Sequence, residues 1–388
     1  MAHFYSFCRR AVAFAAVMIV SATAAFAQPQ FIESQWNGRR VAFLGDSITD
    51  ARQIAQTNNI YWNFLKDILG IEAYVYGISG HRMNQIIGQG ERLMAEHGQE
   101  VDAILVFIGT NDYNGNIPLG EWYTYSDRKT IDDGPVEVVR RHRELNFDDS
   151  TFRGRANTTV RWLKTNYPDK QIIFMTPIHR GYAKFNDKNI QPEESFANAC
   201  GNFIDEYVQT VREIADVWAV PVIDLSAISG LYPMLDEHAH YFRKADTDRL
   251  HPNTPGQLRM AYALAYQLMG YPAYFPKYAA IALDSSIDRR VKAQVDAVLD
   301  SYGVKASYAP MEKSAKTTAF NADSVKDGDI IRLQNHVSDD KLVETIKAFV
   351  PQLQARGFEF LTVTELYGIR GHEPSAFYGA NNTINNIY

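Results

Sequence analysis

The sequence predicts an α/β fold in which a parallel sheet is covered by helices. Short apolar runs alternate with helix-length amphipathic stretches as far as about residue 270. The runs are rich in Val, Ile and Phe and show little polar alternation, which is typical of strands buried on both faces. At 388 residues and 46% hydrophobic, the chain is long enough for two globular domains.

The predicted strands of the larger domain are bounded by Gly, Asn, Asp and Pro, which end regular structure. They span residues 40–44, 73–76, 103–108, 171–175 and 220–225. Helical patterns between them include residues 158–164 and 202–215. Strands that alternate with helices indicate crossover connections and therefore a parallel sheet.

The N-terminus has the pattern of a secretory signal peptide, residues 1–27. Arg9 and Arg10 precede an apolar run, and small residues lead to a cleavage site near Ala27. The alternative is a membrane anchor, but residues 11–20 are short for a bilayer span. We therefore expect export, to the periplasm or the cell exterior, and no stable membrane insertion. Cleavage would leave Cys200 as the one cysteine, without a disulfide partner.

The charge pattern argues against polyanionic partners. The formal net charge is −6, and no Lys/Arg-rich run interrupts the sequence. A nucleic acid or an anionic membrane surface would require a basic patch. We expect a neutral partner instead.

The first predicted strand runs into Gly45-Asp46-Ser47, a small polar triplet. In parallel α/β sheets, chemistry lies beyond the carboxyl ends of the strands, which is where this serine falls. A serine nucleophile needs a base and a group that orients the base. The segment "DTDRLHPNTPG" offers Asp248 and His251 in one predicted loop, directly before a helix start.

A tetrahedral intermediate also needs hydrogen-bond donors for its oxyanion. The second strand end, "YGISGHR", supplies the N–H of Gly80, and the third, "FIGTNDYNG", supplies the amide of Asn111. The N–H of Ser47 is a third donor. Each residue alone also suits a turn, a cap or a surface loop. Their joint occurrence at successive strand ends indicates a catalytic constellation.

These blocks resemble the SGNH hydrolase superfamily, the GDSL esterases and lipases, over about residues 38 to 270. "GDSI" would carry the nucleophile Ser47, and "DRLHPN" would carry the base His251 and its orienting Asp248. "GISG" and "GTND" would complete the oxyanion hole with Gly80 and Asn111. The resemblance implies a flavodoxin-like three-layer α/β/α domain over residues 28–272. It also implies ester hydrolysis through an acyl-enzyme, without metal or other cofactor.

Family members often have an Asn shortly before the glycine of the second block. This chain has Val75 and Tyr76 in that stretch. The departure leaves the assignment of Gly80 in place.

Substrate choice in such a fold depends on the loops. The largest insertion, residues 113–155, carries Trp122 and Tyr123, which would stack on a sugar ring or pack the loop onto the body. The segment "TPIHRGYAKFN" adds His179, Arg180 and Tyr182 to the expected cleft. His179 ranks second as base because no carboxylate lies beside it in the sequence.

Residues 273–388 change character and predict a smaller α/β unit. Strands are expected at 278–283, 329–333 and 358–363, and helices at 289–301 and 340–356. The segments resemble the opening and close of a polysaccharide deacetylase (NodB-homology) domain, at about half its usual length.

The metal ligands of that family are largely missing here. Asp284 keeps the first place of the Asp-Asp pair, but Ser285 replaces the second, and residues 309–328 contain no histidine pair. His336 stands alone where the closing histidine would be. A hydrolytic zinc site needs about three protein ligands, so we expect a truncated, non-catalytic unit.

Three functions remain open from the sequence. The leading one is a secreted serine esterase that removes O-acetyl or other short acyl groups from carbohydrate. It is favoured by the polar loops, by export and by the remnant of a glycan enzyme. A lipid-type esterase, lysophospholipase or thioesterase would use the same triad. An inert glycan-binding protein would be expected to have a broken motif, and the motif is intact.

Overall fold

The structure is a computed structural model that describes residues 29–310, 322–333, 339–370 and 384–387. The predicted signal peptide and His336 lie outside the described residues. No helix in the described ranges combines the length and apolarity that a membrane crossing requires.

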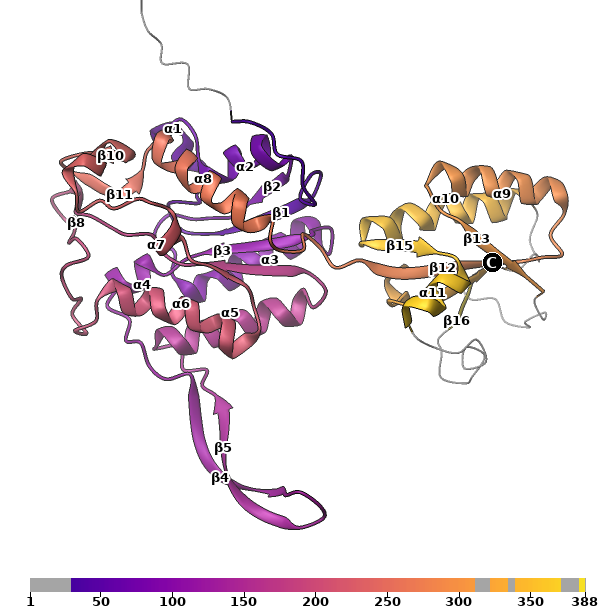
Figure 1. Cartoon of the computed structure of the whole chain (residues 1–388), viewed down its shortest axis with the longest axis horizontal. Coiled ribbons are helices and arrows are strands. Elements are labelled where there is room, and N and C mark those ends of the chain that lie inside the picture. The colour runs from indigo at the N-terminus through magenta and orange to yellow at the C-terminus, as the bar shows by residue number, and fades with distance from the viewer. Residues whose placement is uncertain (1–28, 311–321, 334–338, 371–383, 388) are drawn as a thin grey trace, which may run out of the picture. The chain divides into compact units, whose positions relative to one another are not determined.

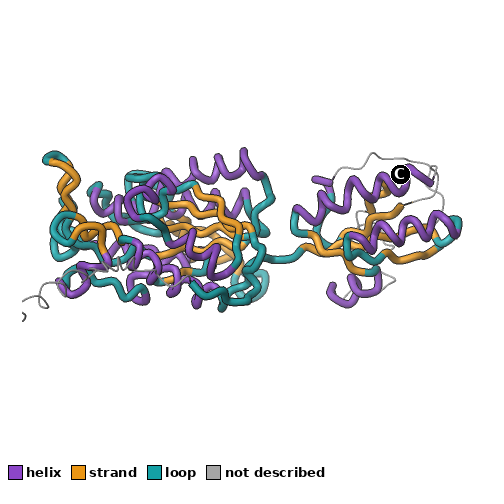
Figure 2. Tube along the Cα trace, turned by 90° about the horizontal axis from the view of Figure 1, so that it is seen from above, coloured by secondary structure: helices purple, strands orange, loops and turns teal. Residues whose placement is uncertain are grey.

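The central sheet has five parallel strands in the order β2-β1-β3-β6-β9. Their bounds are β1 Arg40–Gly45, β2 Glu72–Val75, β3 Ala103–Phe107, β6 Gln171–Met175 and β9 Val222–Ile223. These strands correspond to the five predicted runs, and Figure 2 shows them between layers of helices. The last run is shorter than predicted because Asp224 caps a new helix, accepting a hydrogen bond from the N–H of Ala227.

Side chains of β1 alternate between two hydrophobic cores. Val41 and Phe43 pack with helices α2 (Tyr61–Leu69) and α8 (Thr254–Leu268) on one face. Ala42 and Leu44 pack on the other face with helices α3, α5 and α6, which span Ile86–His97, Phe152–Asn166 and Ile204–Trp218. Figure 1 shows α2 and α8 on one side of the sheet and α5 and α6 on the other. The domain is therefore the predicted three-layer α/β/α fold.

Several short helical segments connect these elements. They are η1 Ala51–Gln53, α1 Ile54–Thr57, η2 Met83–Gln85, α4 Thr110–Asn114, α7 Leu225–Ile228 and η3 Asp236–Tyr241. Helix α4 starts directly after β3 and carries Asn111 at the strand end. The chain thus keeps its polar motifs at the carboxyl edge of the sheet.

Two antiparallel structures were not predicted. A small sheet has the order β10-β11-β7-β8, with bounds β7 Ala183–Asn186, β8 Asn189–Gln191, β10 Phe242–Lys244 and β11 Asp248–Pro252. The insertion after Asn111 forms a hairpin of β4 (Tyr123–Ile131) and β5 (Glu137–Leu145). Asp248 and His251 were predicted to lie in a loop, but they lie on strand β11.

A second α/β structure follows along the chain. Its parallel sheet has the order β13-β12-β14-β16. Strand β15 pairs with the N-terminal half of β12, and β13 pairs with the C-terminal half. The strands are β12 Lys277–Asp284, β13 Ala306–Ala309, β14 Asp329–Leu333, β15 Phe358–Leu361 and β16 Ile384–Ile387. The helices are α9 Arg289–Ser301, η4 Ala322–Ser324, α10 Asp339–Ala355 and α11 Val363–Arg370. This is the smaller α/β unit expected from the sequence, with its own buried clusters.

Candidate active site

A tight turn at the end of β1 presents Ser47. The backbone N–H groups of Thr49 and Asp50 donate to the carbonyl of Asp46, at 3.1 and 2.9 Å. Only glycine fits before the turn, because a Cβ at Gly45 would lie 2.6 Å from the carbonyl oxygen of Phe107. The glycine of Gly-Asp-Ser is thus required because the chain turns close to the neighbouring strand β3.

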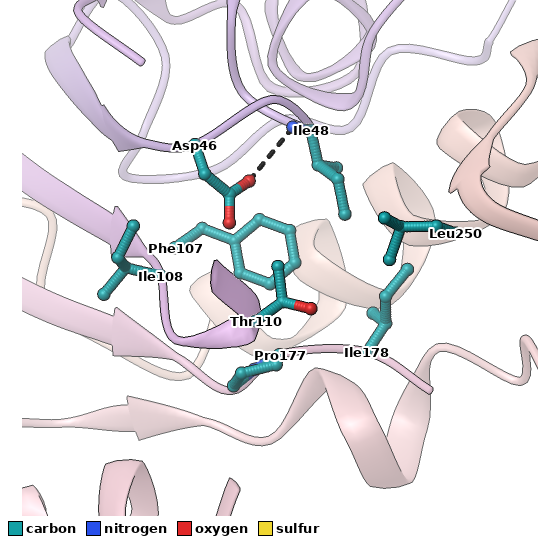
Figure 3. A pocket seen from close by; sticks show the side chains of 8 residues that line it. All are labelled: Asp46, Ile48, Phe107, Ile108, Thr110, Pro177, Ile178 and Leu250. Carbon is teal, nitrogen blue, oxygen red and sulfur yellow. Dashed lines mark hydrogen bonds between the residues drawn. The ribbon is translucent and has the colours of Figure 1, made fainter. Parts of the chain in front are cut away.

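Asp46 lies beneath this turn, at a small cavity. Its carboxylate accepts a 3.0 Å hydrogen bond from the N–H of Ile48, drawn dashed in Figure 3. Burial raises the pKa of Asp46 to about 7 and outweighs that hydrogen bond. The cavity is lined by Asp46, Ile48, Phe107, Ile108, Thr110, Pro177, Ile178 and Leu250. Because the other walls of this cavity are largely apolar, we assign Asp46 and the cavity a structural role beneath the turn.

Strand β11 brings a histidine and a carboxylate to Ser47. The Nε2 atom of His251 lies 2.9 Å from the hydroxyl oxygen of Ser47, although 204 positions separate them in the sequence. The Nδ1 atom of His251 lies 3.0 Å from Asp248 Oδ1 and 3.1 Å from Oδ2. An ionised carboxylate only accepts hydrogen bonds, so Nδ1 carries the proton and Nε2 is left to accept one from Ser47.

Burial and hydrogen bonding determine the charges of His251 and Asp248. Burial disfavours the imidazolium and lowers the pKa of His251, although Asp248 opposes this. Burial also disfavours the ionised form of Asp248, but hydrogen bonds and charge from His251 outweigh it and hold the pKa of Asp248 below its usual range. At neutral pH the site therefore holds a neutral imidazole beside an ionised carboxylate.

Three donors lie around Ser47. The backbone N–H groups of Ser47 and Gly80 have no acceptor among the described residues. Asn111 donates one amide hydrogen to the carbonyl of His81, at 3.0 Å, which leaves the other hydrogen available. Gly80 has a φ of +83°, in the left-handed region, and nothing would meet a Cβ there within 4 Å. The glycine is required by the turn, and its N–H is accessible to a ligand.

Asp50 holds the loop that carries Gly80. Its Oδ2 atom accepts from the N–H of Ser79 at 2.9 Å and from the Ser79 hydroxyl at 2.8 Å. Arg52 also binds both carboxylate oxygens of Asp50. Burial opposes ionisation of Asp50, but these hydrogen bonds outweigh it and hold its pKa well below the usual range. Asp50 was not among the predicted site residues, although it follows Ser47 by only three positions.

A pocket opens at Ser47 with about 610 Å³ of space, part of it open to solvent. It is lined by Ser47, Gln53, Gln56, Ser79, Gly80, Asn111, Phe185, Asn189, Gln191, Arg243, Leu250 and His251. The ring of Phe185 packs edge-on against the imidazole of His251, with centroids 5.4 Å apart. The lining contains side-chain amides and one guanidinium, and it contains no Asp or Glu.

The five residues predicted to bind substrate are absent from this lining. Trp122 is only 9% exposed and lies in the core shared with α5 and α6, where its Nε1–H donates to Glu213 at 2.6 Å. Tyr123 starts strand β4 and is half-buried beside Arg143, whose guanidinium carbon is 4.4 Å from the ring centroid. Of the two predicted roles, stacking on a sugar ring and packing onto the body, Trp122 has the second.

The other predicted side chains, which follow β6, do not line the pocket either. Arg180 is fully buried, and its guanidinium donates to the carbonyl of Thr110 and to the side chain of Gln191. Tyr182 is exposed, yet it does not line the pocket. These side chains are therefore parts of the scaffold or of the outer surface.

His179 has a carboxylate partner that its sequence neighbourhood did not reveal. Its Nδ1 atom lies 2.9 Å from Glu194, fifteen positions further on. The hydrogen bond with Glu194 raises the pKa of His179 and outweighs the effect of burial. His179 does not line the pocket that contains Ser47, so this pair does not form a second base for that serine.

Comparison with known proteins places the chain among acyl hydrolases. A sequence profile of the GDSL-like Lipase/Acylhydrolase family matches residues 43–259, more than half of the chain. None of the curated proteins matches the chain.

Several solved structures are similar to about three fifths of the chain. A protein from Lactobacillus plantarum is 24% identical, covers 61% of this chain and 98% of its own, and has a TM-score of 0.46. A possible lipase from Chitinophaga pinensis is 20% identical over 60% and 98% of the two chains, with a TM-score of 0.44. Phospholipase A1 from Streptomyces albidoflavus is 12% identical over 59% and 99%, with a TM-score of 0.36. The match over residues 43–259 shows that the chain belongs to the GDSL-like lipase/acylhydrolase family.

Proposed function

We propose that this protein is an exported serine esterase that removes O-acetyl or other short acyl groups from carbohydrate. Ester hydrolysis as such follows from membership of the family. The observation that supports the assignment to Ser47 is the hydrogen-bonded series from Ser47 through His251 to Asp248. Ser47 and His251 both line an open pocket. No cofactor is required by this chemistry.

In the proposed mechanism His251 Nε2 accepts the proton of Ser47 as the hydroxyl oxygen attacks the ester carbonyl. Asp248 holds the Nδ1 tautomer and stabilises the imidazolium. The N–H groups of Ser47 and Gly80 and the amide of Asn111 would bind the oxyanion. His251 then gives its proton to the leaving alcohol. Water, deprotonated by His251, attacks the acyl-enzyme and releases the acid and free Ser47.

The pocket lining supports a polar substrate. Gln53, Gln56 and Asn189 offer side-chain amides, which suit the hydroxyl groups of a sugar. The amide of Gln191 is held by Arg180 and Asn189. A long acyl chain would favour an apolar trough. We therefore place a small acyl group and a polar alcohol at this site.

A lipid-type esterase is the second candidate. Phe185 is 40% exposed beside His251, and Leu250 also lines the pocket. Together they offer an apolar surface that a longer acyl chain would cover. A binding protein with an inert site is the third alternative, and it predicts no turnover at all.

We further propose that residues 273–388 are a shortened, non-catalytic relative of polysaccharide deacetylases. Asp284 ends β12, and Ser285 follows where that family has its second Asp. In the described part of the chain, no three His, Cys, Asp or Glu side chains are grouped as a metal site would need. Stoichiometric zinc in the purified protein would contradict this proposal.

Hydrolysis of p-nitrophenyl esters from acetate to decanoate tests the main proposal. The mature protein should hydrolyse acetate fastest, and Ser47→Ala, with an unchanged circular dichroism spectrum, should abolish turnover. Release of acetate from acetylated oligosaccharides would then identify the alcohol. A preference for long chains would support the lipid-type esterase, whereas no Ser47-dependent turnover would support the binding protein.

A further inference from the structure

Arg243 on strand β10 lines the pocket together with Ser47 and His251. Its guanidinium donates one hydrogen bond, from Nη1 to the side-chain oxygen of Gln56 at 3.1 Å. Its Nε atom is buried and has no hydrogen-bond partner among the described residues, as is also true of Arg180 Nε, which lies outside the pocket lining. A buried donor without an acceptor is unfavourable, and a native structure rarely retains one without a reason.

The unused edge of Arg243 is the edge that binds carboxylates elsewhere in this chain. Arg212 holds Asp224 through Nε at 2.8 Å and Nη2 at 3.2 Å. Arg52 holds Asp50 through the same two nitrogens. This two-point geometry is the preferred arrangement of a guanidinium with a carboxylate. In Arg243 neither nitrogen has an acceptor among the described residues.

No described carboxylate forms an ion pair with Arg243 within 4.0 Å. Asp248 acts on it electrostatically from a greater distance, but the oxygens of Asp248 already accept from His251. The chain as a whole has a net charge of −6, yet the pocket lining contains no Asp or Glu. The pocket therefore combines an unpaired cation with a lining free of negative charge, and both features favour an anionic ligand group.

We propose that Arg243 binds a carboxylate of the substrate, and that the ester hydrolysed by this protein lies on an acidic sugar such as a uronic acid. This proposal rests on the proposed esterase function and narrows its substrate class. It replaces the neutral partner that was expected from the net charge of the chain. The sugar side is favoured because Gln56 and Asn189, which line the same pocket as Arg243, offer partners for hydroxyl groups. The carboxylate would bind the part of the Arg243 guanidinium that faces the pocket, while the ester carbonyl lies at Ser47.

A pair of matched esters tests the charge preference. The two acetate esters are 3-acetoxybenzoate, which carries a carboxylate, and 3-acetoxybenzamide, which carries a neutral amide of similar size in its place. Each kcat/KM is divided by the rate of hydroxide-catalysed hydrolysis of the same ester, to remove the difference between leaving groups. We expect wild-type protein to favour the benzoate about tenfold or more, as a charge-assisted hydrogen bond would give.

Variants identify the residue responsible. Arg243→Gln should lower the benzoate-to-benzamide ratio about tenfold, and Arg243→Lys should lower it less, because lysine keeps the charge without the two-point geometry. Lys244→Gln removes the same charge at the next, exposed position and should leave the ratio unchanged. Competitive inhibition of the wild type by glucuronate, with glucuronamide as the neutral control, needs no variant. It provides the test if Arg243→Gln does not fold.

The source of the carboxylate is tested separately. Methyl glycosides of acetylated glucuronic acid and acetylated glucose carry the charge difference on the alcohol. The p-nitrophenyl esters of adipic acid and of its monomethyl ester carry it on the acyl group. We expect discrimination in the sugar pair, and discrimination confined to the adipate pair would overturn the assignment to an acidic sugar.

Failure of this inference differs from failure of the proposed function. Ser47-dependent hydrolysis of both benzoyl-derived acetates at equal normalised rates, unaltered by Arg243→Gln, would overturn the role of Arg243 and leave the esterase intact. An absence of Ser47-dependent hydrolysis of any ester would overturn the proposed function itself.

Discussion

The ends of two parallel strands, β1 and β12, differ in what gathers around them. Strand β1 ends before Asp46 and Ser47, and a histidine 204 positions away lies 2.9 Å from the serine hydroxyl. Strand β12 ends on Asp284, whose carboxylate accepts from the N–H of Ser286 within its own turn, at 2.9 Å. Both strands have buried centres and polar ends, yet among the described residues only the first brings together side chains from distant segments.

The difference shows why a polar strand end is not by itself a site. Parallel sheets place polar residues at their carboxyl edge wherever the chain must turn, and most of these residues only cap the turn. Chemistry requires that a second segment bring a complementary group, as β11 brings His251 to Ser47. At the end of β12, the described part of the chain brings no such group to Asp284.

The largest effect is expected from Asp248→Asn, which keeps the shape of the site and alters the hydrogen bond to His251. The amide can donate to Nδ1 and so favour the wrong tautomer, with Nε2 protonated. We expect kcat on p-nitrophenyl acetate to fall ~10³-fold or more. A fall of less than tenfold would mean that Asp248 does not orient the catalytic base, which would weaken the contrast between the two strand ends.

Asn111→Ala tests the oxyanion donors at the end of β3. Removal of one preorganised donor is expected to lower kcat about 10²-fold. The substitution also removes the 3.0 Å hydrogen bond to the carbonyl of His81, so the thermal midpoint of unfolding is measured in parallel. An unchanged kcat in a folded variant would exclude the amide from the oxyanion hole.

The pH dependence of kcat/KM tests the state of His251. Only the neutral imidazole can accept the Ser47 proton, so activity should fall as the pH drops through the pKa of His251, about tenfold per pH unit well below it. Because burial lowers this pKa, the midpoint should lie below 6.5, the ordinary value for histidine. An acid limb centred above that value would contradict the described environment.

Asp50→Asn tests a positioning residue. The amide keeps one acceptor but loses the paired oxygens that hold Ser79 and Arg52. We expect kcat to fall about tenfold while KM changes little, because the loop bearing Gly80 would lose its alignment with the developing oxyanion. If the variant lost thermal stability together with kcat, Asp50 would have a purely structural role.

The smallest effect is expected at the end of β12. Asp284→Asn, or dialysis against a chelator, should leave the normalised esterase rate within about twofold of wild type, since surface changes outside a site are usually mild. The control is Asp248→Asn in the same assay. A large loss from either treatment would show that the second α/β structure contributes to turnover.

Much of the fold could be predicted from the sequence because local pattern decides it. Strand β6 and helix α9 have the predicted bounds, since apolar runs and helical periodicity define them directly. The start of α8 was indicated by Pro252-Asn253-Thr254-Pro255, and the Asn253 side chain does cap that helix. The positions of Ser47, Gly80 and Asn111 followed from motifs at strand ends.

The rest depends on contacts between distant segments. Trp122 looked available for stacking, but its indole N–H meets Glu213, 91 positions away, and the ring joins the core. Phe185 and Asn189 reach the pocket through the small antiparallel sheet, whose strands are only three to five residues long. Strands that short leave no periodicity to detect. No local sequence pattern marks Arg243 either, because the feature that singles it out is the absence of a hydrogen-bond acceptor for Nε among the described residues.

The central claim, that Ser47 is the nucleophile activated by His251, is tested most directly by covalent labelling. The protein is treated with diisopropyl fluorophosphate, and the adduct is located by mass spectrometry of its peptides. We predict one phosphoryl adduct per chain on Ser47, lost in Ser47→Ala and strongly slowed in His251→Ala. A stoichiometric adduct on another residue, or none on a folded protein that hydrolyses p-nitrophenyl acetate, would contradict the account.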